Sequence, residues 1–417
     1  MREKLTRRSI FQLGLPLCLG GCASDAGGDA RKEENAEPTV ELFSWWIAPS
    51  EADALDALIA VHSKSYPHEK IYNAAIDSGA KAKEVLAERL AANRPPDLYQ
   101  ENAYSLAAVM ARNPGSLVSL TELFRSEGLF DVVLPEVISD VTLDGEIYSM
   151  PVNIHRENAL HYNVKIFADL ELDVPTTLEE LLAVCDKLKQ AGVTPLATSY
   201  QGWIQRVMFN SIAAASLGPA AFESYFLGKS ELDEAAMGDA IDLLDNLLTN
   251  YVNDSATDPA FLWTDAADLL LNRQAAMFMH GDWAKGYLTQ LGWEPGVGFG
   301  VVGAPGAADL FLYGVDVFAL LAGDLEPDAA KDFLKTVASK EGQAAFNKLK
   351  GSSAIRLDAD LDDLDVVARA TIESQRNAKI RMLTRSKSAW DDAHQAFAIT
   401  RDKAALIAAY RDNPPDK

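Results

Sequence analysis

Short apolar runs alternate with helical patterns along most of this 417-residue chain, and this alternation constrains the fold more than any other feature. Residues 40–46 form a short apolar strand pattern, and apolar residues then recur at helical spacing through residues 51–66. A second helical pattern at 81–92 stops at a Pro-Pro pair, and a strand restarts at 98–99. Strands interleaved with helices predict an α/β architecture.

The rest of the chain continues this order. We expect strands at 159–162, 276–279 and 311–321, a hairpin around Asp144-Gly145-Glu146, and helices at 177–190, 203–217, 235–250, 264–273, 327–339, 341–350, 361–378 and 389–410. A chain of this length exceeds one simple core, so we expect two packed lobes. Because the strand at 311–321 is followed only by helices, the chain is expected to cross between the lobes more than once.

The first 21 residues have the pattern of an export signal. Four basic residues precede the apolar run 10–19, and the sequence LGGC follows, ending at Cys22. This ending resembles a bacterial lipobox, in which Cys22 becomes the lipidated first residue. The apolar run is too short to cross a bilayer core of about 30 Å. We therefore expect a signal at 1–21, a disordered tether at 22–37, and an extracytoplasmic protein held to a membrane by lipid. Two adjacent arginines leave the twin-arginine and the general export routes both open.

Charge and cysteine content exclude several function classes. The formal net charge of −23 would repel phosphate backbones, so nucleic-acid binding is excluded. Of the three cysteines, Cys18 leaves with the signal and Cys22 carries lipid, so Cys185 stands alone and no internal disulfide is expected. Cys185 lies on an apolar helical face and is interpreted as a core residue.

No motif predicts a catalytic centre, a metal site or a cofactor. Gly298, Gly300 and Gly303 have the spacing of a dinucleotide fingerprint, but Pro305 and Gly306 follow at once and indicate a loop after a strand. The acidic residues after 357 lack the glycine and glutamate of a calcium loop. The six histidines do not occur at metal-ligand spacing, and Gly-x-Ser-x-Gly is absent. We therefore expect a protein that makes and breaks no bonds.

Aromatic and polar residues meet instead at the ends of the expected elements. The candidate ligand-binding residues are Trp45, Trp46, Glu51, Gln100, Asn102, Asn153, His155, Trp203, Trp263, Asp282 and Lys350. In α/β sheets, ligands collect at the carboxyl ends of strands. A sugar suits such a set, because its apolar C–H face covers an aromatic ring while polar side chains pair with its hydroxyl groups.

Five segments resemble the extracellular solute-binding proteins of bacterial sugar ABC transporters, most closely their glucose/mannose-binding branch. The segments are ELFSWW, RPPDLYQ, DGEIYSMPVNIHRENALHYN, MFMHGDWAKGY and GQAAFNKLKGSSAIRLD, in family order between Val40 and Arg385. The resemblance implies a type II-like periplasmic-binding-protein fold, in which a hinge with several chain crossings joins two lobes. We expect an N-terminal lobe of 38–153 plus 299–345 and a C-terminal lobe of 154–298 plus 346–417.

The resemblance also implies roles for individual residues. Trp45 and Trp263 would flank a sugar, and hydroxyl groups would be bound by Glu51, Gln100, Asp282 and Lys350. Asn153 and His155 would lie near the hinge, and Trp203 near the cleft. The chain departs from the branch at Asn102, where a histidine is usual, and at residues 384–387, where a His-Gly pair is replaced by Thr-Arg-Ser-Lys. These departures leave glucose itself open, along with other monosaccharides and larger or acidic sugars.

The expected protein is thus a monomeric lipoprotein that captures a small carbohydrate between closing lobes and delivers it to an ABC permease, without a cofactor. Three alternatives stay open. The same fold could bind a non-sugar solute such as a peptide or polyamine. A secreted carbohydrate-active enzyme could use Glu51 and Asp282 as an acid/base pair. A sensor could signal through a partner instead of feeding a permease.

Overall fold

A computed structural model describes residues 37–76, 79–323 and 327–415. The expected export signal, the lipidated Cys22 and the tether up to residue 36 lie outside the described residues. Among the residues described, no helix is both long enough and apolar enough to cross a membrane.

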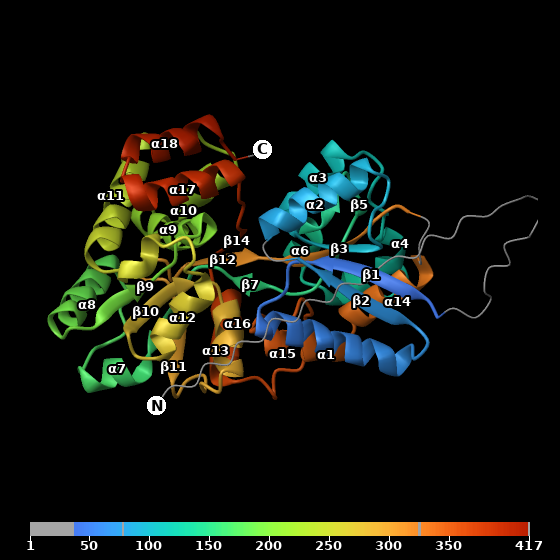
Figure 1. The fold of residues 1–417 in the computed structure, drawn as a ribbon, viewed down its shortest axis with the longest axis horizontal. Coiled ribbons are helices and arrows are strands. Elements are labelled where there is room, and N and C mark those ends of the chain that lie inside the picture. Colours follow the sequence, from blue (N-terminus) through green and yellow to red (C-terminus); the bar gives the residue numbers. More distant parts are fainter. Residues whose placement is uncertain (1–36, 77–78, 324–326, 416–417) are drawn as a thin grey trace, which may run out of the picture. The chain divides into compact units, whose positions relative to one another are not determined.

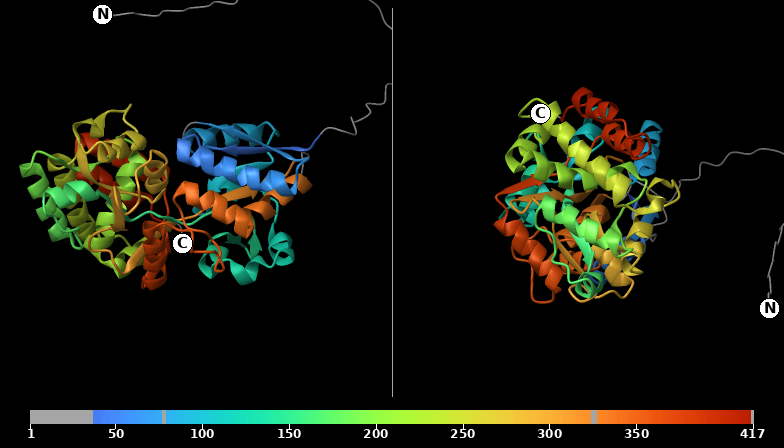
Figure 2. Two further views of the ribbon diagram at one scale, coloured as in Figure 1. Left: turned by 90° about the horizontal axis from the view of Figure 1, so that it is seen from below. Right: turned by 90° about the vertical axis from the view of Figure 1, so that its left-hand side faces the viewer.

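The described residues form one hydrophobic core in the N-terminal lobe, called the first core and the first lobe below, and two in the C-terminal lobe, around separate sheets (Figures 1 and 2). The first core is built from β1 (Thr39–Ser44), α1 (Pro49–Ser65), β2 (Lys70–Ala75), α2 (Gly79–Ala91), β3 (Leu98–Asn102), η1 (Ala103–Ser105), α3 (Leu106–Arg112), α4 (Thr121–Ser126), α5 (Leu129–Val132), α6 (Pro135–Asp140), β4 (Thr142–Leu143), β5 (Glu146–Ile147), β6 (Met150–Pro151), β13 (Asp316–Leu320), α14 (Pro327–Ala338) and α15 (Lys340–Lys350). Its sheet has the order β2-β1-β3-β13-β6, with β1 parallel to β2 and β3 and with β13 antiparallel to β3.

The C-terminal lobe, which is the second lobe along the chain, has a four-stranded sheet of order β11-β8-β10-β9. Its elements are β8 (Ala159–Asn163), α7 (Val164–Asp169), α8 (Leu178–Gln190), β9 (Thr194–Ala197), α9 (Gly202–Leu217), α10 (Pro219–Phe226), α11 (Glu234–Asn250), η2 (Asp254–Thr257), α12 (Trp263–Leu271), β10 (Ala275–His280), α13 (Trp283–Gln290), β11 (Phe299–Gly303), α16 (Val366–Asn377), α17 (Ser388–Thr400) and α18 (Lys403–Asp412). Every residue of β10 is buried, as expected for a strand covered by helices on both faces.

A small third sheet connects the two lobes. It contains β7 (His155–Arg156), β12 (Leu310–Gly314) and β14 (Ile380–Leu383), in the order β14-β12-β7. The chain passes from one lobe to the other next to β7, next to β12 and in the loop after α15, and Figure 1 shows the three strands of this sheet between the two groups of elements. The predicted two-lobed α/β fold with several crossings is therefore confirmed.

The predicted lobe boundaries are wrong at two places. Residues 299–303 form β11, which pairs with β8 and so belongs to the C-terminal lobe. The predicted change of lobe after residue 345 divides α15, whereas the whole helix packs along α1 and Phe346 joins the first core. The chain changes lobe at the loop that begins with Gly351, whose left-handed φ of 87° ends the helix.

Two other predicted elements are divided in the structure. The strand expected at 311–321 is two strands, because β12 joins the crossing sheet and β13 joins the first sheet. The helix expected at 389–410 ends at Arg401, which has a φ of 56°, and α18 starts afresh. The predicted hairpin is confirmed, with Asp144 and Gly145 both at positive φ between β4 and β5.

Candidate functional site

The first wall of the candidate site lies at one edge of the first sheet. Because β1 and β3 are parallel, their carboxyl ends meet, and the Trp45 backbone N–H donates to Gln100 Oε1 at 3.1 Å. Since β13 runs the other way, its first residue, Asp316, lies opposite Asn102 and accepts a hydrogen bond from its amide at 3.1 Å. Trp45 is half-buried, with its ring edge-on to Tyr99.

An ion pair between a buried lysine and a partly exposed glutamate lies beside this edge, between the ends of two packed helices. Lys350, at the end of α15, donates to Glu51 Oε1 in the first turn of α1 at 2.7 Å. Its Nζ also lies 5.5 Å from the centre of the Trp46 ring. Trp46 is 1% exposed and packs against Phe318 and Phe346. The ring of Trp46, which the sequence led us to expect beside a ligand, belongs to the first core.

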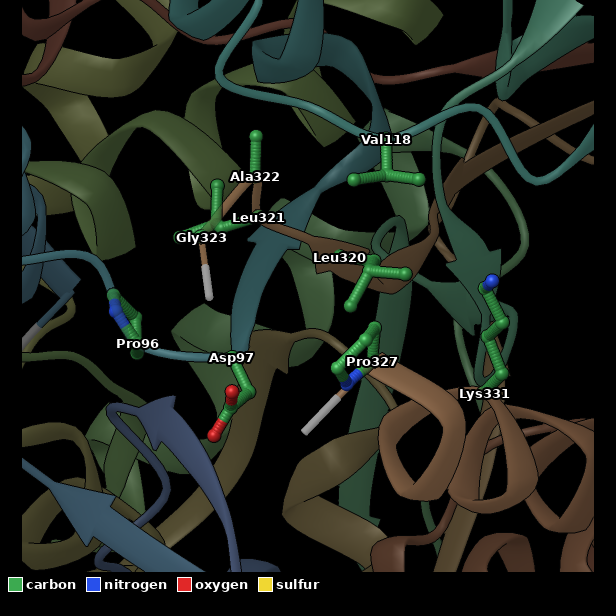
Figure 3. A pocket seen from close by; sticks show the side chains of 9 residues that line it. All are labelled: Pro96, Asp97, Val118, Leu320, Leu321, Ala322, Gly323, Pro327 and Lys331. Carbon is green, nitrogen blue, oxygen red and sulfur yellow. The ribbon is translucent and has the colours of Figure 1, made fainter. Parts of the chain in front are cut away.

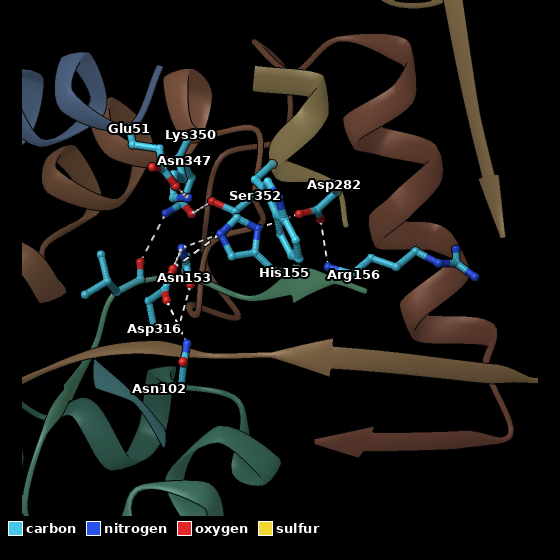
Figure 4. A network of polar contacts seen from close by, with 12 residues as sticks. Glu51, Asn102, Asn153, His155, Arg156, Asp282, Asp316, Asn347, Lys350 and Ser352 are labelled. Carbon is cyan, nitrogen blue, oxygen red and sulfur yellow. Dashed lines mark hydrogen bonds and ion pairs between the residues drawn. The ribbon is translucent and has the colours of Figure 1, made fainter. Parts of the chain in front are cut away.

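A polar network spans the crossing between the lobes (Figure 4). His155 of β7 contacts Asp282 of the C-terminal lobe through Nδ1 and lies 3.4 Å from Asp316 of the first sheet through Nε2. Asn153 donates to Asp316 Oδ2 at 2.9 Å and accepts from the Asp316 backbone N–H at 3.0 Å. The other carboxylate oxygen of Asp282 accepts from the Arg156 backbone N–H at 2.8 Å. All five residues are buried.

The charges of this network are mutually stabilising. Burial by itself lowers the pKa of His155, but Asp282 and Asp316 raise it above its ordinary value in total. Burial by itself raises the pKa of Asp316, but His155, Lys350 and the Asn153 amide bring it below its ordinary value. The imidazolium and carboxylate forms therefore favour one another in the folded protein.

Aromatic side chains of the C-terminal lobe adjoin this network. Trp203 begins α9 and Trp263 begins α12, and their rings lie 5.4 and 5.6 Å from the ring of His280 at the end of β10. Trp283 lies between His280 and His155, at 4.8 and 5.1 Å. The three indoles are partly exposed. The network is thus continuous from the edge of the first sheet to these tryptophans.

Charged side chains from both lobes lie around Tyr104, and no sequence motif marks them. In the first lobe, Lys83 pairs with Glu101 at 2.9 Å and lies 5.7 Å from the Trp45 ring and 5.9 Å from the Tyr104 ring. In the C-terminal lobe, Arg206 of α9 pairs with Asp391 of α17 at 2.6 Å. Burial raises the pKa of Tyr104, and the cations of Lys83 and Arg206 act against that rise. Groups from both lobes therefore lie within electrostatic reach of Tyr104.

Apart from Trp46, the predicted residues fall into two groups. Trp45, Glu51, Asn102, Trp203 and Trp263 keep part of their surface exposed. Five others are buried and hold neighbouring groups in place: Gln100, Asn153, His155, Asp282 and Lys350. Asp316 is not among the predicted residues, because it lies inside the run expected to be one continuous strand. Within the described residues, no cluster of three or more His, Cys, Asp or Glu side chains could hold a metal ion.

A surface pocket lies at the opposite end of the same sheet. Figure 3 shows it between Pro96 and Asp97 at the start of β3, Leu320 and Leu321 at the end of β13, and Lys331 of α14. The ends of β3 and β13 that carry Asn102 and Asp316 point the other way. The pocket is therefore separate from the candidate site.

Residues 48–344 match the family model of bacterial extracellular solute-binding proteins. An uncharacterised ABC transporter extracellular-binding protein of Pyrococcus horikoshii is 30% identical over 375 residues, which cover 88% of this chain and 82% of the relative. A probable sugar-binding periplasmic protein of Rhizobium meliloti is 30% identical over 387 residues, which cover 91% of this chain and 87% of the relative.

A solved chitin oligosaccharide binding protein has a similar fold. The two structures superpose with a TM-score of 0.78 at 20% sequence identity, covering 90% of this chain and 97% of the other. At this identity the likeness concerns the fold alone, and it agrees with the predicted type II-like arrangement of two lobes.

Proposed function

We propose, since the chain belongs to the bacterial extracellular solute-binding proteins, that it captures a small neutral carbohydrate between its two lobes and presents it to an ABC permease. The family places the chain outside the cytoplasm. The relatives named for transport and sugar binding support the finer proposal.

One observation carries the proposal: partly exposed indoles from both lobes adjoin the ends of one continuous polar network. Trp45 comes from the first lobe, and Trp203 and Trp263 come from the second. An indole face can cover the C–H face of a pyranose and displace water from both. Glu51 and Asn102 offer partly exposed polar atoms that pair with hydroxyl groups. Each such hydrogen bond contributes about 1 kcal/mol net, so several bonds and two stacked faces give micromolar affinity.

The charges near these residues favour a neutral ligand. Lys350 is paired with Glu51, Lys83 with Glu101, and Arg206 with Asp391. A polyamine or an acidic sugar would have to break one of these pairs and leave a charge in a low-dielectric site without its partner. A neutral sugar can instead add hydrogen bonds to charges that stay paired.

The mechanism is closure around the ligand. Contacts that a sugar makes with both lobes exist together only when the lobes are close, so binding shifts the population toward the closed state. Because the chain passes between the lobes next to β7, next to β12 and in the loop that begins with Gly351, closure has to bend the chain at these three places.

The arrangement of the carboxylates does not favour a glycosidase. Glu51 is held by Lys350, and Asp282 is held by His155 and the Arg156 backbone N–H. A catalytic acid must deliver a proton to the leaving oxygen, whereas both groups accept hydrogen bonds from protein donors here.

We also propose that Cys22 is lipidated and that the protein works as a membrane-anchored monomer. The LGGC ending of the export signal supports the anchor. Metabolic labelling with a fatty-acid analogue tests it: the wild-type chain should carry label and fractionate with membranes, and Cys22→Ser should do neither. Label on Cys22→Ser, or soluble wild-type protein, would contradict the anchor.

The function is tested by thermal unfolding of the chain without its export signal, in a panel of neutral mono- and disaccharides with polyamines and peptides as controls. A true ligand at 100 times its dissociation constant stabilises the protein by about 2.7 kcal/mol. Calorimetry on each positive compound should give a micromolar constant for a sugar. Stabilisation by a polyamine or peptide alone would overturn the sugar assignment.

A further inference from the structure

His280 lies at the centre of the aromatic cluster of the C-terminal lobe. It is the last residue of β10 and is completely buried. Its ring stacks on Phe278 at 4.6 Å, and three indoles surround it, those of Trp283, Trp203 and Trp263, at 4.8, 5.4 and 5.6 Å. Because the three indoles are partly exposed and the imidazole is not, His280 lies behind the surface that they form.

One hydrogen bond fixes the protonation state of this histidine. Trp283 Nε1 lies 2.7 Å from His280 Nε2. An indole nitrogen only donates, so His280 Nε2 must accept and its proton must lie on Nδ1. Protonation of Nε2 would place two donors against each other. Burial lowers the pKa of His280 well below its ordinary value, and the neighbouring His161 and His155 lower it further. The ring is therefore neutral across the physiological range.

The backbone beneath Trp283 is equally constrained. A Cβ at Gly281 would lie 1.9 Å from Trp283 Cζ3, so the indole rests directly on the glycine. The other edge of the indole meets His155, which belongs to the polar network between the lobes. Three contacts therefore fix the plane of the Trp283 ring: the hydrogen bond to His280, the packing on Gly281 and the contact with His155.

We propose that His280 is a positioning residue for sugar recognition: it fixes Trp283 through Nε2 and holds Trp203 and Trp263 in place as one stacking wall. This inference rests on the proposed function, because the wall is the surface against which the C–H face of a sugar would lie. Leucine could fill the same volume but would leave the Trp283 N–H without an acceptor. Glutamine could restore the acceptor because its side-chain oxygen can reach a similar position.

The first test is spectroscopic and needs no ligand. In ¹⁵N-labelled wild-type protein, the His280 ring should show a protonated Nδ1 and an unprotonated Nε2, unchanged from pH 8 to pH 5. His280→Leu should alter the near-ultraviolet circular dichroism of the tryptophans, and His280→Gln should preserve it. A protonated Nε2, a titration near pH 6.5, or an unchanged spectrum in His280→Leu would overturn the inference.

The second test measures binding by calorimetry with D-glucose, D-galactose, D-xylose, maltose and cellobiose. For each sugar that wild-type protein binds, His280→Leu should weaken binding about tenfold, the loss expected when a stacked face is disordered, and His280→Gln should stay within about threefold. Trp283→Phe, which removes the donor and leaves His280 in place, gives the same readout should His280→Leu fail to fold. Equal affinity in wild type, His280→Leu and Trp283→Phe would overturn the inference.

Wild-type protein that binds none of the sugars would instead contradict the proposed function, and the spectra would still decide whether His280 positions the indoles.

Discussion

Two adjacent tryptophans at the end of β1 have opposite roles. In an extended chain, successive side chains point to opposite sides. Trp46 therefore enters the first core against Phe318 and Phe346, while Trp45 stays half-exposed with Lys83 near its ring. The sequence predicts that aromatic residues gather at this strand end, but it does not reveal which of the two faces the core. That choice depends on helix α15, some 300 residues further along the chain.

Replacing the two tryptophans should separate stability from binding. Trp46→Ala should lower the free energy of unfolding by about 3–5 kcal/mol, because it leaves a cavity in the first core. Trp45→Ala should weaken sugar binding about tenfold with a much smaller loss of stability. Urea unfolding and calorimetry give the two quantities. Tyr72→Ala, which removes a 60% exposed aromatic side chain from β2, is the control and should change neither. An equal loss of affinity in the control would contradict the role of Trp45.

At the scale of elements, the sequence predicts local structure well and sheet membership poorly. The hairpin at β4–β5 was predictable because Asp144-Gly145 has a specific turn chemistry. The apolar run 311–321 is predicted as one strand because nothing in its pattern marks the change of sheet near Val315. Both halves are fully buried, so periodicity cannot separate them. The site residue Asp316 was lost with that boundary.

The network at β7 should make stability depend on pH. Because folding raises the pKa of His155, the protonated ring stabilises the folded protein. This stabilisation is complete below pH 6.5, the ordinary pKa of histidine, and is lost as the pH rises through the higher pKa of the folded state. The groups that face it are Asp282 from α13, Asp316 from β13 and Lys350 from α15. The free energy of unfolding of the wild type should therefore fall relative to His155→Gln as the pH rises above 6.5. Chemical denaturation at several pH values measures both, and parallel curves would contradict the ion network.

At acidic pH the trend reverses, and the free energy of unfolding falls as the pH falls. Folding lowers the pKa of Asp316, so its carboxylate stabilises the folded protein above pH 3.8, the ordinary pKa of aspartate. This stabilisation is lost as the pH falls through the lower pKa of the folded state. The wild-type advantage over His155→Gln should accordingly be largest near pH 5, where the imidazolium and the carboxylates coexist.

The close approach of α13 to α15 gives a second test at this scale. A Cβ at Gly286 would lie 2.5 Å from the carbonyl oxygen of Lys350, so Gly286→Ala must push the two helices apart. We expect a loss of about 1–3 kcal/mol in the free energy of unfolding. Gly238→Ala on α11 is the matched control, because its Cβ would lie closest to the flexible end of Lys403, at 3.1 Å, with Ile407 Cδ1 at an ordinary contact distance of 3.9 Å. Alanine there should be neutral or stabilising, and equal losses in both variants would contradict the contact.

For the whole molecule, the site arises where segments distant in sequence meet. Asn102 contacts Asp316, His155 contacts Asp282, and Lys350 contacts Glu51. The sequence predicted most of these residues, because aromatic and polar side chains at element ends are visible in it. It did not predict their pairing, which depends on how often the chain crosses between lobes. Tyr104 and Arg206 belong to none of the quoted segments, and the role of His280 becomes visible only from the aromatic rings packed around it.

The most direct measurement is a crystal structure of the protein in complex with a sugar identified by the thermal-unfolding panel. The account predicts one sugar enclosed between the lobes, with its ring faces against Trp45 on one side and against the indoles of the C-terminal lobe on the other, and with the Lys350–Glu51 pair intact. A sugar bound to one lobe alone, or in the pocket beside Pro96 and Lys331, would contradict it.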